Sequence, residues 1–190
     1  MNLPKSWNEV TVDSFIDIKS IDEGGNSLFL HNIEFLSVLG DIPPEELEDL
    51  PPNEITDMVL SVAWSRKEPS TKHKNKIKQF TLFPINKVTL GQYIDLEHYF
   101  TDNFIQHLKT ICAIRYKLSD LDKWGNIEFE PYTYSIHQRA NEFSDLPITD
   151  VYGVLGEYLE FRKQINTTYS GLFSSEEFDT EGLTQEEIRE

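Results

Sequence analysis

The fold is decided by the segment at residues 148–165, which reads ITDVYGVLGEYLEFRKQI. Side chains that share one helical face recur in it at intervals of three and four residues, which is the period of an amphipathic helix. The positions on that face are Val151, Tyr152, Leu155, Tyr158, Leu159 and Arg162. This is the most regular helical period in the chain, and it predicts a strong helix over residues 148–165.

Capping residues mark further helices before this segment. Thr89 and Gln92 have the spacing of a capping box, in which each side chain bonds the other's backbone N–H, so a helix is expected after Thr89. Thr11 is the expected N-cap of a short helix that follows it, and Asn53 can cap a later one. A helix that starts near residue 26 is expected to end at Gly40, in a left-handed C-cap.

Between these helices the pattern is less regular. Short apolar runs on both sides of Pro84 predict one or two strands, which place a small β element between Lys76 and Val88. Residues 117–131 are predicted to form a polar loop, and residues 132–143 a helix. The fold class expected is therefore mainly α: a compact helical domain at residues 1–168 with a minor β-hairpin.

The last part of the chain loses the helical period. Residues 173–190 hold seven acidic side chains and one basic one, with scattered apolar residues between them. Such a composition buries too little apolar surface to fold by itself. We expect residues 169–190 to form a flexible acidic C-terminal arm, in which Phe173 or Phe178 could dock on a neighbour.

Composition and charge exclude several classes of protein. The 190 residues include 33 acidic and 17 basic side chains, a net charge of −16, which argues against a protein that coats nucleic acid. An apolar content of 38% is too high for a disordered chain. No apolar stretch approaches the ~20 residues of a membrane helix, and the first residues lack a signal-peptide core. We expect a soluble protein of a reducing compartment with no membrane partner.

Charge is unevenly distributed along the chain. Residues 34–57 hold eight acids and no base, whereas residues 65–78 hold six cations and only Glu68, a local charge of +5. Three interpretations remain open for this basic segment: a solvated loop, a contact with nucleic acid, or a contact with an acidic protein. It lacks the aromatics that stack on bases, which favours the protein partner. The contact residues predicted are Trp7, Arg66, Lys67, Lys72, Lys74, Lys76, Lys78, Phe173 and Phe178.

No pattern in the sequence indicates catalysis, a cofactor or a metal. The five histidines do not have the spacing of a helical zinc site. Residues 120–125 resemble the start of a calcium loop, but the fifth position is Trp124 and the twelfth is Pro131. A tight turn built on Asp and Gly is the favoured interpretation. Cys112, the single cysteine, lies among apolar residues and is expected in the core.

Four stretches together resemble a known group of proteins. They read LPKSWNEVT at residues 3–11, VTLGQYIDL at 88–96, LPITDVYG at 146–153 and YSGLF at 169–173, before an acidic end. In this order they resemble small proteins of the virion-structure gene blocks of tailed bacteriophages of Bacteroidota, crAss-like phages included. The resemblance spans most of the chain and transfers no catalytic residue.

The resemblance implies one of two non-enzymatic roles. The first is a ring or connector component of the portal–tail assembly, located in the virion at the tail or portal vertex. The second is a tail-assembly factor that acts in the host cytoplasm and is absent from the mature particle. Either role implies other virion proteins as partners, and opposite charges on one chain suit a homo-oligomer or ring.

Overall fold

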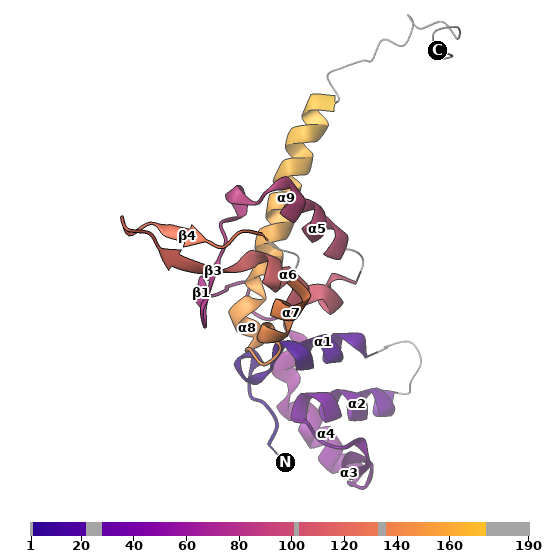
Figure 1. The fold of residues 1–190 in the computed structure, drawn as a ribbon. Helices are drawn as coiled ribbons and strands as arrows, with labels where there is room; N and C mark the ends of the chain where they lie inside the picture. The colour runs from indigo at the N-terminus through magenta and orange to yellow at the C-terminus, as the bar shows by residue number, and fades with distance from the viewer. Residues whose placement is uncertain (1, 22–27, 101–102, 133–135, 174–190) are drawn as a thin grey trace, which may run out of the picture. The chain divides into compact units, whose positions relative to one another are not determined.

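The structure is a computed structural model that describes residues 2–21, 28–100, 103–132 and 136–173. It divides into two units, Met1–Glu157 and Tyr158–Glu190. Helices dominate the described residues, and a small antiparallel sheet accompanies them, as expected for a mainly α protein with a minor β element (Figure 1).

The first unit begins with four helices, drawn from indigo to violet in Figure 1: α1 (Val12–Ser20), α2 (Leu28–Gly40), α3 (Pro44–Glu48) and α4 (Pro52–Ser61). The Thr11 side chain accepts a hydrogen bond from the Ser14 N–H at 3.1 Å, which confirms the predicted N-cap. The buried face of α1 consists of Val12, Phe15 and Ile16. Short 3-10 turns, η1 (Trp7–Glu9) and η2 (Ala63–Arg66), flank this group.

Two predicted helix ends are wrong in detail. The residue that takes the left-handed conformation after α2 is Asp41, with φ of 49°, while Gly40 is the last residue of the helix. A Cβ at Gly40 would lie 2.8 Å from side-chain carbons of Leu3 and Ile42, so glycine makes room there for packing. Helix α4 starts with Pro52 at its first position, which needs no N–H partner, so Asn53 lies inside the first turn.

The sheet has four strands in the order β1-β2-β3-β4, all antiparallel: β1 (Lys76–Ile77), β2 (Phe80–Leu82), β3 (Tyr116–Leu121) and β4 (Ile127–Phe129). The predicted β element between Lys76 and Val88 is confirmed by β1 and β2. The predicted loop at residues 117–131 is wrong, because β3 and β4 form a second hairpin there. Most of that hairpin is solvent-exposed, so neither face of its strands has to be apolar. The polar residues in these strands made the segment look like a loop in the sequence.

The middle of the chain forms the centre of the first unit. The capping box of α5 (Leu90–Tyr99) is present in full, as predicted, after the short turn η3 (Ile85–Lys87). A 3-10 turn, η4 (Phe104–His107), leads into α6 (Leu108–Arg115), whose Cys112 is fully buried as expected. The described part of the helix predicted over residues 132–143 consists of α7 (Ile136–Ala140) followed by η5 (Asn141–Phe143), and residues 133–135 lie outside the described residues.

The segment predicted as one helix over residues 148–165 forms α8 (Ile148–Val151) and then α9 (Gly153–Phe173), which crosses the boundary between the units. Residues 169–173, which we expected to belong to the flexible arm, are helical. The remainder of the arm, with Phe178, lies outside the described residues. The arm therefore stays a prediction for residues 174–190 only.

Gly153 allows the backbone of residues 71–72 to approach the start of α9 closely. A Cβ at this position would lie 2.1 Å from the Thr71 carbonyl oxygen and 2.7 Å from the Lys72 carbonyl carbon, which is closer than any side chain allows. The backbone of residues 71–72 therefore rests directly on the start of α9. Gly156, one turn later, has open space at the same place.

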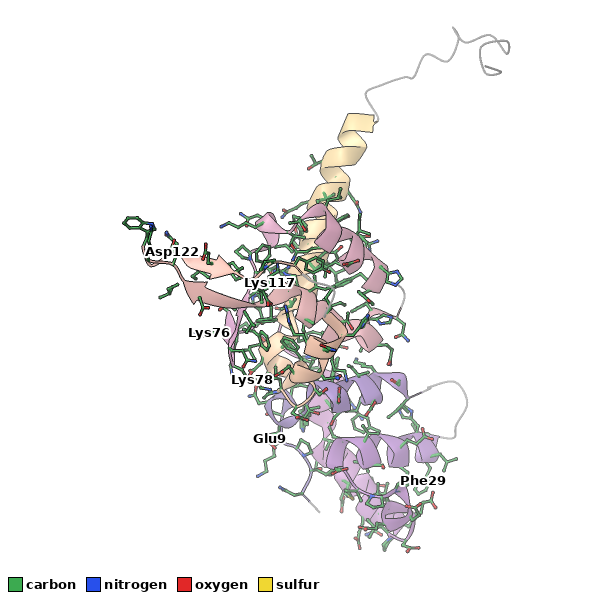
Figure 2. The ribbon with its side chains drawn as sticks, in the orientation of Figure 1. Glu9, Phe29, Lys76, Lys78, Lys117 and Asp122 are labelled. Atoms are coloured by element: carbon green, nitrogen blue, oxygen red, sulfur yellow. The ribbon has the colours of Figure 1, made fainter. Side chains whose placement is uncertain are left out.

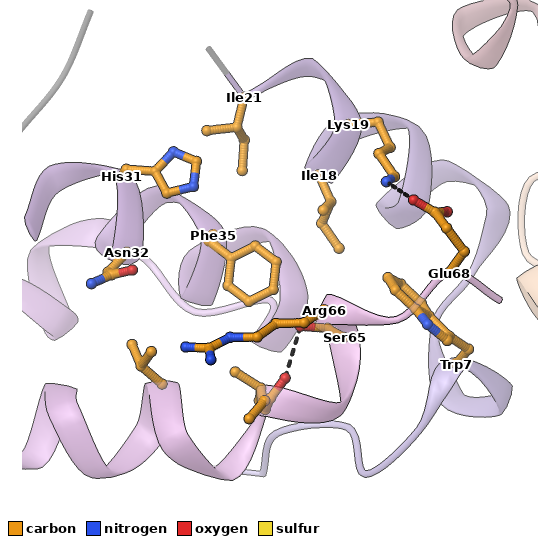
Figure 3. Close-up of a pocket in the computed structure, with 13 residues that line it drawn as sticks. Trp7, Ile18, Lys19, Ile21, His31, Asn32, Phe35, Ser65, Arg66 and Glu68 are labelled. Atoms are coloured by element: carbon orange, nitrogen blue, oxygen red, sulfur yellow. Dashed lines mark hydrogen bonds and ion pairs between the residues drawn. The ribbon is translucent and has the colours of Figure 1, made fainter. Parts of the chain in front are cut away.

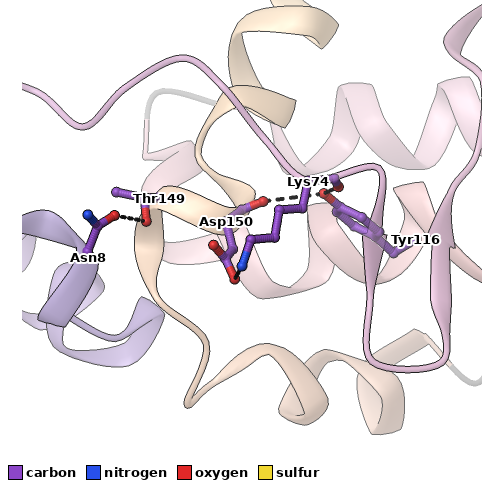
Figure 4. A network of polar contacts seen from close by, with 5 residues as sticks. All are labelled: Asn8, Lys74, Tyr116, Thr149 and Asp150. Atoms are coloured by element: carbon purple, nitrogen blue, oxygen red, sulfur yellow. Dashed lines mark hydrogen bonds and ion pairs between the residues drawn. The ribbon is translucent and has the colours of Figure 1, made fainter.

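Hydrogen bonds hold this contact in place (Figure 4). The Lys74 N–H donates to the Asp150 carbonyl at 3.0 Å, and the Tyr116 hydroxyl donates to the Lys74 carbonyl at 2.6 Å. The Lys74 ammonium also pairs with the Asp150 carboxylate at 2.8 Å, and the Thr149 hydroxyl donates to Asn8 at 2.8 Å. Hydrogen bonds thus connect residues 71–74 to the start of β3 and to α8.

Replacing Gly153 with alanine should lower the free energy of unfolding. The new methyl group meets the Thr71 backbone, which cannot rotate away as a side chain can, so we expect a loss of about 1–3 kcal/mol. The matched control is Gly156→Ala, which we expect to be neutral or stabilising by up to about 1 kcal/mol, because helix propensity improves without a clash. Urea denaturation of both variants measures this. Equal effects at the two positions would contradict the contact.

Candidate partner-binding surfaces

The six cations of residues 65–78 are all exposed, as a contact surface requires. Their backbone, however, is not a flexible loop. Residues 71–74 lie on α9 as described, Lys76 belongs to β1, and Lys78 occupies the tight β1–β2 turn with φ of 51°. The segment is therefore displayed on a fixed backbone, and Figure 2 shows Lys76 and Lys78 beside the sheet.

Two of the predicted contact lysines are already occupied within the chain. Lys74 pairs with Asp150, and the Lys78 ammonium donates to the Glu142 carbonyl at 3.0 Å. Arg66, Lys67, Lys72 and Lys76 form no ion pair with any described residue. These four side chains are the ones available to a partner. In the sequence nothing distinguishes them from Lys74 and Lys78, because the distinction depends on residues about 70 positions away.

Trp7 is buried against α1 and Trp64 in the fold, and its predicted role as a partner contact stays a prediction. Its ring is only 9% exposed and makes edge-to-face contacts with Phe15 at 5.4 Å and Trp64 at 5.1 Å. The indole N–H donates to the Lys67 carbonyl at 2.6 Å. Trp7 thus holds the start of the basic segment against α1.

The acidic residues 34–57 lie on α2, α3 and α4 and the turns between them. All eight carboxylates are exposed, and the seven from Asp41 to Asp57 form no ion pair with a lysine or arginine among the described residues. The first unit therefore carries an acidic surface on these helices and a separate group of cations after them. Among the described residues, the acids from Asp41 to Asp57 and four of the six cations have no ion-pair partner.

A cleft of about 330 Å³ lies between α1, α2, α4 and η2 (Figure 3). Its apolar wall includes Ile18, Phe35, Val59 and Val62, and its polar groups are those of His31, Asn32, Ser65 and Arg66. The Nδ1 atom of His31 is buried and has no hydrogen-bond partner among the described residues. The sequence did not indicate this cleft, because four separate elements build it.

One end of the cleft is closed by an ion pair between Lys19 and Glu68 at 2.7 Å, visible in Figure 3. Burial raises the pKa of Glu68, but hydrogen bonds from the Lys19 ammonium and the Tyr152 hydroxyl outweigh it, so the pKa lies below the ordinary value of 4.5. Among the described residues that line the cleft, the one acid is therefore ionised and already paired. Arg66 remains as the unpaired charge in the cleft.

The β3–β4 hairpin ends in an exposed apolar tip that the sequence prediction missed. Trp124 is 76% exposed, Leu121 70% and Ile127 55%. Figure 1 shows the hairpin extending away from the helices of the first unit. Asp122 shapes the turn, since its carboxylate accepts hydrogen bonds from the N–H groups of Trp124 at 2.7 Å and Asn126 at 2.8 Å, while Gly125 takes φ of 81°. This is the Asp–Gly turn that was favoured over a calcium loop.

Two buried cations join the sheet to its neighbours. Arg115 donates to the Phe83 carbonyl at 3.0 Å and to Glu157 at 2.7 Å, and Lys117 lies 3.9 Å from the centre of the Phe83 ring. Burial lowers the pKa of both groups, against the opposing effects of Glu157 and Glu130. Both cations lie inside the sheet–helix packing and line none of the clefts described here.

Within residues 2–21, 28–100, 103–132 and 136–173, no group of three or more His, Cys, Asp or Glu side chains could hold a metal ion. In the same ranges, no helix is both long and apolar enough to cross a bilayer. Phe173 is the last residue of α9, and the structure does not describe its side chain. Its predicted role as a contact stays a prediction, as does that of Phe178.

The Asp122 turn predicts a specific pH dependence at the hairpin tip. Hydrogen bonds from Asn126, Trp124 and Gly125 outweigh the small effect of burial and hold the pKa of Asp122 below its ordinary value of 3.8. Because the folded pKa is depressed, the turn is stabilised by the ionised carboxylate above pH 3.8, and this contribution is lost as the pH falls through the lower folded value. NMR titration of the Trp124 and Asn126 amides should give a midpoint below 3.8. A midpoint at or above 3.8 would contradict the turn.

Comparison of the whole chain with protein-family models, with curated proteins and with solved structures finds no match in any of the three.

Proposed function

We propose that this chain is a non-enzymatic structural protein of a tailed-bacteriophage particle, a ring or connector component of the portal–tail assembly. Its work is to bind other virion proteins or further copies of itself at the tail or portal vertex. The resemblance of its four sequence stretches to proteins of phage virion-structure gene blocks supports a role in a phage particle. The surfaces described above support a binding role.

The observation that carries the proposal is the separation of unpaired charge on one unit. Lys67, Lys72 and Lys76 are exposed on a fixed backbone without an acidic partner, while acidic residues 34–57 cover a different set of helices. Opposite charges displayed apart on one molecule attract a second molecule in a head-to-tail contact, which closes into a ring when the rotation allows it. An acidic protein surface fits this segment better than nucleic acid, because the segment lacks the aromatic side chains that stack on bases.

The exposed hairpin tip is a second support for a binding role. Leu121, Trp124 and Ile127 together present apolar surface to solvent at a turn held rigid by Asp122. Tryptophan is enriched among the residues that dominate binding energy at protein interfaces. A tail-assembly factor absent from the mature virion would need the same surfaces, so it remains the alternative role.

Purified particles separate these two roles. For a ring or connector component, quantitative mass spectrometry of gradient-purified virions should find the chain at a fixed copy number relative to the portal protein. An assembly factor would be present in infected-cell lysates and absent from particles. Absence from both particles and assembly intermediates would refute the proposed function.

Charge reversal tests the surface itself. In the triple variant Lys67→Glu, Lys72→Glu, Lys76→Glu, each lost exposed ion pair should contribute roughly 0.2–1 kcal/mol, so association weakens on the order of tenfold. The remaining association should also respond less to salt, because its screened attraction is gone. Light scattering across a salt titration, alone and with candidate virion partners, measures both effects.

The matched control carries the same change in net charge at three exposed lysines outside the basic segment: Lys5→Glu, Lys87→Glu, Lys163→Glu. We expect it to associate nearly as the unmodified chain does. If both triple variants associate equally, the effect is one of net charge alone and the basic segment is only a solvated surface.

A further inference from the structure

The cleft between α1, α2 and α4 continues into a second hollow of about 180 Å³ along α2 and α4. The two share Asn32 and Val59, and the second adds Phe29, Pro52, Ile55 and Leu60 to the lining. We call the two together the α2–α4 groove. Phe29 is 44% exposed and Leu60 62%, so the groove has an apolar wall open to solvent.

The outer surface of α2 and α4 is acidic, but the polar groups that line the α2–α4 groove favour an anionic group at Arg66. Arg66, which extends along the cleft in Figure 3, has no ion pair among the described residues, and the buried His31 Nδ1 has no partner there either. Among the described residues that line the groove, the one acid is Glu68, and Lys19 neutralises it. The acids at Glu54 and Asp57 of α4 are not part of the lining of either hollow. A carboxylate that reaches Arg66 therefore meets no unpaired negative charge among the described lining residues.

Arginine binds a carboxylate through two parallel hydrogen bonds, which adds direction to the attraction. An apolar groove beside such a cation suits a peptide that carries an aromatic or aliphatic side chain next to acidic ones. Such a peptide exists in this sequence. Residues 174–190, SSEEFDTEGLTQEEIRE, hold seven acids and one base together with Phe178, Leu183 and Ile188. Fully extended, 17 residues reach about 60 Å, enough to meet another molecule.

We propose that the acidic C-terminal segment, residues 174–190, of a neighbouring copy docks in the α2–α4 groove. Phe178 enters the apolar part beside Phe35 and Val59, and a neighbouring carboxylate binds Arg66. Since the occupant comes from a second copy, the inference rests on the proposed assembly role. It identifies one contact between copies in that assembly. The contact joins two different surfaces, so repetition builds a head-to-tail chain or ring.

The test uses the full chain with its own segment disabled by Phe178→Ser, Leu183→Ser, Ile188→Ser. Addition of a synthetic peptide of residues 174–190 to this isotope-labelled chain should give saturable NMR shifts at Val59, Phe35 and the Arg66 side chain. A peptide with Phe178→Ser, and separately a chain that also carries Arg66→Glu, should bind at least tenfold more weakly. Arg66→Lys, which keeps the charge, should recover part of the affinity, and Lys87→Glu should leave it unchanged.

Light scattering completes the test, because the disabled chain should have a lower average mass than the unmodified one at equal concentration. Absence of shifts in the groove, or shifts confined to another surface, would overturn the inference. A peptide that binds the groove while the unmodified chain stays monomeric at every concentration would also overturn it, since the contact would then lie within one copy. If the chain is found in virions but the peptide does not bind its groove, the proposed function stands and only the proposed groove contact is wrong.

Discussion

The contact of the Thr71–Lys72 backbone with Gly153 is the constraint on which the rest of the first unit depends. It brings a strand-forming segment from the first half of the chain onto the start of α9. The Tyr116 hydroxyl donates a hydrogen bond to the Lys74 carbonyl, which connects the start of β3 to the residues just before β1. Because β2 pairs with both β1 and β3, all three strands are positioned beside the helices. The same contact turns a charged run of sequence into a surface with defined positions. Binding through such a surface loses less conformational entropy than binding through a loop.

A buried ion pair reinforces the arrangement from the inside. Arg115 is fully buried and joins the Phe83 carbonyl, at the end of β2, to Glu157 on α9. Breaking such a pair leaves a charge in a medium of low dielectric constant, which is strongly destabilising. The buried Arg115–Glu157 pair thus fixes the position of β2 against α9. The exposed cations and the hairpin tip lie outside this contact.

Local signals in the sequence predicted local structure well. The caps at Thr11 and Thr89, the buried face of α1 and the strands near Pro84 depend on neighbours within a few residues, and all are present. The β3–β4 hairpin was missed because an exposed edge needs no apolar alternation. The basic segment was found, but its division into occupied and available lysines was not, since Asp150 and Glu142 lie far along the chain. Trp7 was expected at a partner contact, and the structure places it in the core. A tryptophan that packs in the core and one that contacts a partner look the same in a sequence.

The central claim is that the available cations of residues 65–78 meet carboxylates of another molecule of the assembly. Zero-length carbodiimide cross-linking of an equal mixture of light and heavy isotope-labelled chains measures this most directly. The proposed assembly predicts mixed light–heavy peptide pairs that join Lys67, Lys72 or Lys76 to acidic residues of 34–57 or 174–190. Lys74 linked to Asp150 within one chain serves as the internal reference, at 2.8 Å. Products that join these lysines only within single chains, at every concentration at which the protein associates, would contradict the claim.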